Sequence, residues 1–173
     1  MATDPISLVH AKLWDLALLH PYIAARVLSG NRIKLDHPKR FPLEHAIGEA
    51  DLPELMLLPT TGVQFDVQDS QKARLVRDFE WGLSTGDLRV AEQLFPLEWA
   101  LFRAMAGARV AMLTTPTWNE KAFVQDVTTG PARSTMGDQE HNRSIPGWYG
   151  VYLVRVSMQF DRADLPNYTT ISP

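Results

Sequence analysis

A thirteen-residue stretch near the C-terminal end, Trp148–Phe160, constrains the fold more than any other part of the chain. Its residues alternate with a period of two, as they do when successive side chains point to opposite faces of an extended strand. One face is apolar throughout and comprises Trp148, Gly150, Tyr152, Val154, Val156, Met158 and Phe160. The other face is apolar only up to Leu153 and polar from Arg155 onward. We therefore expect a long central strand whose first half is covered on both faces and whose second half is covered on one. Either a helix or another copy of the protein is expected to cover the second face.

Composition limits the class of protein further. The chain has 173 residues, 45% of them hydrophobic and 21% charged, with a formal net charge of −3 and no cysteine. These values are typical of one globular domain. The slightly negative net charge does not indicate the positively charged surface that tight nucleic-acid binding requires. The lack of cysteine excludes disulfides, thiolate nucleophiles and cysteine-ligated zinc. No apolar run has the ~20 residues of a membrane helix, and the N-terminus lacks the pattern of a signal peptide, so synthesis in a cytoplasm is expected.

An amphipathic helix is predicted at the start of the chain, beginning at Pro5, because proline suits a first helical position. Apolar residues follow at helical spacing: Ile6, Val9, Leu13, Leu16 and Leu19. Pro21 predicts a kink or a break, after which Tyr22–Leu28 is expected to form a shorter helical stretch. Gly30 and Asn31 predict a left-handed stop behind it.

A second helix is predicted over Leu88–Ala106, with Gly107 as its stop. One apolar row runs along it: Val90, Leu94, Leu97, Leu101 and Met105. Three aromatic residues widen that row: Phe95, Trp99 and Phe102. The resulting stripe is broader than packing on one sheet face requires. Pro96 inside the pattern indicates either a kink or a helix whose regular part begins near Phe95.

Extended segments occupy most of the remaining chain. Besides Trp148–Phe160, strands are predicted at Arg32–Leu35, Glu54–Leu58, a segment beginning at Val63, Arg74–Leu83, Arg109–Leu113 and Ala122–Thr128. Pro59 is expected to end the strand over Glu54–Leu58, which is apolar enough to be buried on both faces. Two long polar segments, Asp36–Pro53 and Gly130–Gly147, are expected to be loops.

This order of elements predicts an α+β fold, a single domain in which two helices pack on a mostly antiparallel sheet. Residues 1–160 are expected to form the domain, with a long loop at 130–147, and residues 161–173 a polar C-terminal tail.

The five histidines do not have the spacing of a metal site. His37 and His45 lie in the first long loop and His141 in the second, while His10 and His20 lie ten residues apart on the first helix. No pair has the three- to five-residue spacing of a helical ligand set, so no metal is expected.

Catalytic motifs are also lacking. Asp78 and Glu80 fall on the same side of a predicted strand, but paired acids on a solvent-facing strand explain that pattern more simply than acid–base catalysis. Neither a G-x-S-x-G motif nor a phosphate-binding glycine loop occurs. We therefore expect no enzymatic activity and no cofactor.

An excess of apolar surface is the main functional signal. The broad helical stripe, the strand half that is apolar on both faces and a long loop together favour an oligomer over a monomer, because uncovered apolar patches mark protein interfaces.

Several segments carry a resemblance to a known family. They are Gly30–Ile33, Glu54–Leu58, Asp78–Trp81 with Ser84–Asp87, Leu94–Ala104 and Gly147–Val151, in the order helix, strands, helix, strands. Over roughly Ile6–Phe160 the chain resembles the tail-terminator and tail-completion proteins of long-tailed bacteriophages and their prophage relatives. The resemblance rests on the order of the elements and on the general residue character of these segments, since this family has no short diagnostic motif.

The resemblance implies an α+β subunit that forms a hexameric ring in the neck of the virion. Such a ring caps the tail tube protein, meets a head-tail connector or stopper protein on its other side, and lets DNA pass through the lumen without sequence-specific binding. The interface residues expected on this basis are Lys39, Arg40, Arg133, Met136, His141, Ile145, Trp148 and Arg155. A stopper, a tail-completion protein or another minor tail component remains an alternative of the same class, and a small enzyme or a monomeric binding module an alternative of a different class.

Overall fold

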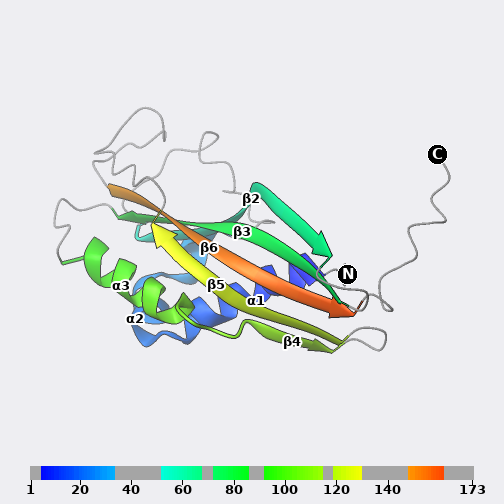
Figure 1. Ribbon diagram of the computed structural model, residues 1–173. Coiled ribbons are helices and arrows are strands. Elements are labelled where there is room, and N and C mark those ends of the chain that lie inside the picture. Colours follow the sequence, from blue (N-terminus) through cyan, green and yellow to red (C-terminus); the bar gives the residue numbers. More distant parts are fainter. Residues whose placement is uncertain are drawn as a thin grey trace.

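The computed structural model describes residues 5–33, 52–67, 72–85, 92–114, 119–129 and 148–161 (Figure 1). The elements are α1 (Pro5–Leu19), α2 (Pro21–Arg26), the 3₁₀ turn η1 (Ser29–Asn31), β1 (Arg32–Ile33), β2 (Glu54–Val67), β3 (Lys72–Thr85), α3 (Leu94–Met105), β4 (Ala111–Thr114), β5 (Asn119–Thr129) and β6 (Trp148–Asp161). They form an α+β fold, as the sequence predicted. None of the described helices is long and apolar enough to cross a membrane.

One sheet with the strand order β1-β2-β3-β6-β5-β4 forms the frame of the molecule. The strand predicted at Trp148–Phe160 is β6, and it lies inside the sheet with β3 on one side and β5 on the other. All described strand pairs are antiparallel except β1 with β2, which is parallel. The prediction of a long inner strand and a mostly antiparallel sheet is confirmed.

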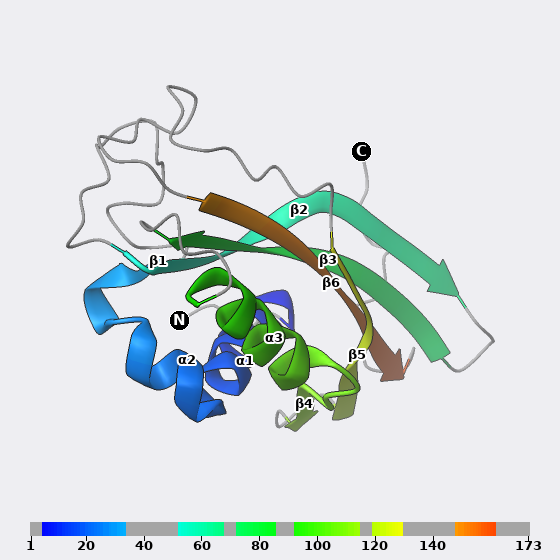
Figure 2. The same cartoon turned by 90° about the vertical axis from the view of Figure 1, so that its left-hand side faces the viewer.

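The helices α1, α2 and α3 lie together on one face of the sheet (Figure 2). The apolar row of β6 predicted from the sequence faces them, and its residues Tyr152, Val154, Val156, Met158 and Phe160 are buried. The core beneath them includes the edge-to-face pair of Trp14 on α1 and Trp81 on β3, whose ring centroids are 4.9 Å apart. Burial of this face therefore holds the two layers together.

On the opposite face, burial changes along the strands. Near the start of β2 and the end of β3 that face is buried, at Met56, Gly82 and Ser84. On β6, Leu153 is half-buried and Arg155 is exposed. Val151 is also only half-buried, and Ser157, further along the same face, is fully buried, so the predicted change from a two-sided to a one-sided environment does not hold along β6.

The two N-terminal helices confirm the break at Pro21, but the predicted stop at Gly30 is wrong. Val27 already leaves the helix in an extended conformation, and Gly30 is not in the left-handed region. Arg32 instead closes α2, since its guanidinium donates hydrogen bonds to the carbonyl oxygens of Val27 (3.0 Å) and Ala24 (3.3 Å).

The predicted end of a strand at Pro59 is also wrong, because β2 continues to Val67 as one strand. Its pairing with β3 shifts register between Pro59 and Val63. A proline is compatible with this position because, among the described residues, β2 pairs with β1 only at Leu55 and Met56, and the missing N–H removes no ladder bond there on that side.

Helix α3 begins at Leu94, so the prediction of a helix that starts at Leu88 is wrong. The alternative interpretation of Pro96, a helix whose regular part begins near Phe95, agrees with the structure. Pro96 then lies in the first turn, where its N–H would have no helical acceptor. Gly107 follows the helix with a φ of 67°, as the predicted stop requires.

Candidate functional site

Helix α3 has two apolar faces and buries only one of them. Its inner residues Leu94, Leu97, Ala100, Leu101 and Met105 are buried against the core. Phe95, Trp99 and Phe102 are 55%, 61% and 44% exposed. Trp99 and Phe102 lie one turn apart and stack, with ring centroids 5.6 Å apart and planes inclined by 16°. A row of large aromatic side chains is therefore left on the surface.

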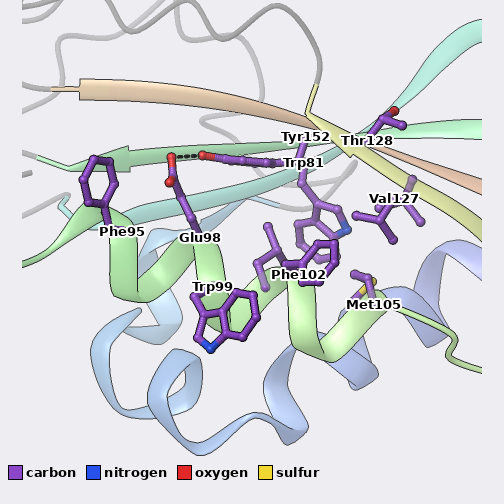
Figure 3. Close-up of a pocket in the computed structure, with 11 residues that line it drawn as sticks. Trp81, Phe95, Glu98, Trp99, Phe102, Met105, Val127, Thr128 and Tyr152 are labelled. Carbon is purple, nitrogen blue, oxygen red and sulfur yellow. Dashed lines mark hydrogen bonds between the residues drawn. The ribbon is translucent and has the colours of Figure 1, made fainter. Parts of the chain in front are cut away.

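A groove of about 670 Å³ lies between this aromatic row and strands β5 and β6. Its lining residues come from α3 and from the strands β3, β5 and β6 (Figure 3): Trp81, Phe95, Glu98, Trp99, Leu101, Phe102, Met105, Val127, Thr128, Tyr152 and Val154. Most of these side chains are apolar, and a cavity of this size and character is typical of a binding site.

One polar pair crosses the groove. The Tyr152 hydroxyl on β6 donates a hydrogen bond to Glu98 Oε1 on α3 (Figure 3). Burial raises the pKa of the Tyr152 phenol above its ordinary value, and the hydrogen bond and negative charge of Glu98 raise it further. The phenol therefore stays protonated at neutral pH and acts as a donor, not as a base.

Gly150 makes room for this tyrosine. It precedes Tyr152 by two residues on the same face of β6, and a Cβ at Gly150 would overlap the tyrosine ring, with Cζ only 3.0 Å away. A glycine is thus required here by close packing and not by its backbone conformation.

Strand β5 borders the groove with an open edge. Its only strand partner on the side away from β6 is β4, among the residues described, and β4 reaches Ala122 and no further. The amide of Val124 donates to the Ala108 carbonyl (2.8 Å). Beyond it, Val127 and Thr128 line the groove, so aromatic side chains and an unpaired strand edge adjoin each other.

The exposed part of the other sheet face is mainly polar, although Phe123 on β5 is 38% exposed there. Arg155 on β6 donates to both carboxylate oxygens of Asp78 on β3, at 2.8 and 2.9 Å. Arg74 donates to Ser157 Oγ (2.9 Å) and to Gln125 Oε1 (2.6 Å). The neighbouring Glu80 has a pKa raised by burial. Of the two acids singled out in the sequence, Asp78 thus belongs to a surface ion pair with Arg155.

Two of the predicted interface residues fall in the described part of the chain. Trp148 begins β6 opposite Thr85. Arg155 is exposed and paired with Asp78. The other six lie outside the described residues: Lys39, Arg40, Arg133, Met136, His141 and Ile145.

The structure also places two of the histidines. His10 is buried on α1, with Nε2 3.1 Å from the Leu57 carbonyl oxygen, and it links α1 to β2. Within the described ranges no three potential ligands come together as a metal site.

The groove itself was missed by the sequence analysis. The aromatic residues of α3 were recognised as an excess, but nothing in a linear pattern places Glu98 against Tyr152 or opens the β5 edge beside them. The breadth of the α3 stripe was the one signal that pointed to this surface.

Comparison of the chain with models of known protein families and with curated proteins found no match.

Proposed function

We propose that the protein is a structural component of a bacteriophage neck, similar to a tail terminator, and that it acts as a closed ring of six copies. The observation that carries this proposal is the second apolar face of α3. An exposed aromatic row beside an open strand edge is characteristic of a surface that associates with protein.

The arrangement of the layers supports a ring around DNA. All three helices lie on one face of the sheet, and the opposite face exposes a mixture of acidic and basic groups. If the helices face outward, the lumen is lined by a surface of nearly balanced charge: Arg74, Asp78, Glu80, Asp126 and Arg155. Such a lining binds phosphate weakly, so DNA moves through it without being held.

In this role the ring has protein partners and no catalytic task. One rim meets the last layer of the tail tube protein and stops its polymerisation, and the other rim meets a head-tail connector or stopper protein. The protein is then a part of the virion, made in the cytoplasm of the bacterial host.

Two measurements test the proposal. Negative-stain microscopy and native mass spectrometry of the purified chain are expected to give rings with six times the mass of one chain and an opening that admits duplex DNA. Added to polymerising tail tube protein, encoded by a neighbouring gene, the chain is expected to shorten the tubes and to sit at one tube end. Tubes of unchanged length without a terminal ring would contradict a terminator role.

The groove also favours a second candidate function, the binding of a small molecule by an enzyme or a monomeric binding module. Its volume of about 670 Å³ and the Glu98–Tyr152 pair are compatible with an apolar ligand that carries a hydrogen-bonding group. A chain that remains monomeric at high concentration and whose tryptophan fluorescence changes with a small apolar ligand would favour this alternative.

A further inference from the structure

The charge of the groove beside α3 indicates which class of small molecule fits it. Among the described residues that line it, Glu98 is the only one that carries a charge at neutral pH, and no lysine, arginine or histidine faces it there. Glu98 is half-buried, and the hydrogen bond that it accepts comes from the neutral phenol of Tyr152. A carboxylate that is partly removed from water is stabilised by a positive charge beside it, which this lining does not supply.

Aromatic rings surround this carboxylate. Phe95 precedes Glu98 by three positions on α3 and Phe102 follows it by four, so both lie about one helical turn away on the same side of the helix. Tyr152 faces Glu98 from β6 (Figure 3). The faces of aromatic rings carry partial negative charge and therefore attract cations. The carboxylate and the rings thus favour the same sign of charge on a ligand.

The inner wall of the groove is held in place by the core. Trp81 is fully buried and packs edge-to-face on Trp14, while Tyr152 fills the space that Gly150 leaves. The groove volume of about 670 Å³ suits a molecule of ordinary ligand size, and its mostly apolar lining suits an apolar body. A wall fixed before binding lowers the cost of ordering side chains around a ligand.

We infer that the groove binds a small organic cation, an inference that rests on the second candidate function of the groove and not on the proposed ring. The apolar body of the ligand packs against the aromatic side chains, and its protonated amine donates a charge-assisted hydrogen bond to Glu98. Tyr152 contacts Oε1 of this carboxylate, which leaves Oε2 to accept from the amine. Tyr152 then orients Glu98 and does not itself bind the positive charge.

Three small molecules that differ in charge test the inference on the unaltered chain: 2-phenylethylamine, 2-phenylethanol and 3-phenylpropanoate. All three carry a phenyl ring on a two-carbon chain, and at neutral pH they are a cation, a neutral molecule and an anion. Titration is followed by calorimetry and by the fluorescence of tryptophan, because Trp81 and Trp99 line the groove. The amine is expected to bind with a Kd of about 1 mM, as suits a ligand of this size. It is expected to bind about tenfold more tightly than the other two.

Glu98→Gln tests where the positive charge binds. The amide oxygen still accepts a hydrogen bond from Tyr152, but the negative charge is removed. The affinity for the amine is expected to fall about tenfold, while that for 2-phenylethanol changes less than about twofold. Glu92→Gln is the matched control, because it removes the same charge at an exposed position outside the lining. It is expected to leave both affinities unchanged, and thermal unfolding verifies that both variants are folded.

Three results would overturn the inference. Equal affinity for the three molecules would show that the groove selects apolar surface alone, and it would leave the candidate function of small-molecule binding intact. Amine binding that Glu98→Gln does not weaken would place the cation elsewhere on the chain. No binding of any of the three at about 10 mM would remove both the inference and that candidate function.

Native mass spectrometry of the same samples reports ring formation separately. Rings that bind no amine would contradict only the small-molecule site, and a monomer that prefers the amine would contradict only the ring.

Discussion

Tyr152 joins the two layers of the molecule through one side chain. Its ring packs in the groove, its hydroxyl donates to Glu98 on α3, and Gly150 leaves the space that the ring fills. This contact connects the inner strand β6 to the helix that carries the exposed aromatic row, so changes here affect both stability and the groove.

Tyr152→Phe is expected to lower the free energy of unfolding at neutral pH by about 1–2 kcal/mol, because Glu98 loses its donor. The effect depends on pH in a defined direction. The folded state raises the pKa of the phenol above the ordinary value of 10.0, so the unfolded chain releases this proton first. The contribution is therefore complete below pH 10.0 and is lost as pH rises above it.

Urea denaturation of the wild type and Tyr152→Phe from pH 7 to 11 checks this prediction. The difference between the two proteins is expected to shrink above pH 10.0. A difference in the free energy of unfolding that stays constant over this range would show that folding does not raise the pKa of the Tyr152 phenol.

Gly150→Ala is expected to destabilise the fold by about 1–3 kcal/mol, since the added methyl group forces the Tyr152 ring away from its position. Tyr152→Phe combined with Gly150→Ala is expected to cost less than the sum of the two single changes, because they affect the same contact. Additive costs would contradict the packing described for this pair.

At the scale of single elements, α3 provides a matched test of its two faces. Leu101 is buried and the adjacent Phe102 is 44% exposed. Leu101→Asp places a charge in the core and is expected to unfold the domain, a loss of more than about 4 kcal/mol. Phe102→Asp is expected to leave the monomer folded, with a loss of less than about 1 kcal/mol.

Circular dichroism during thermal unfolding distinguishes these two variants. Equal damage by both substitutions would show that the outer face of α3 is part of the core and would remove the basis of the proposed interface.

Elements were predictable where local pattern and tertiary packing agree. The alternation in Trp148–Phe160 and the 3.6-residue rhythm around Leu97 and Leu101 are imposed by one buried face, so they are visible in the sequence. The predictions at Pro59 and Gly30 were wrong because the tertiary context differs from the usual one. Pro59 lies where β2 has no partner on its β1 side in the described part of the chain, and at Gly30 the chain has already left α2 at Val27.

The candidate site was predictable only in part. The aromatic excess of α3 is a local property and was visible. Its position beside Tyr152 and β5 depends on strand order, which brings together residues as distant in sequence as Glu98 and Tyr152, which are 54 positions apart. No linear pattern encodes that pairing.

For the molecule as a whole, the layers and edges lead to one claim, that copies of the chain cover the aromatic face of α3 for one another. The helices occupy one side of the sheet (Figure 2), and the other side exposes mainly polar side chains together with Phe123. The groove beside α3 is the apolar surface that this arrangement leaves open.

The mass of Trp99→Glu in solution, compared with that of the wild type and of Trp99→Phe at one concentration, tests this claim most directly. Trp99 is 61% exposed, so neither change is expected to unfold the subunit, which thermal unfolding verifies. A charge at the centre of an interface costs about 2 kcal/mol or more per contact, which weakens association at least tenfold. We expect hexamers for the wild type and Trp99→Phe and monomers for Trp99→Glu; hexamers of equal stability for all three proteins would contradict the claim.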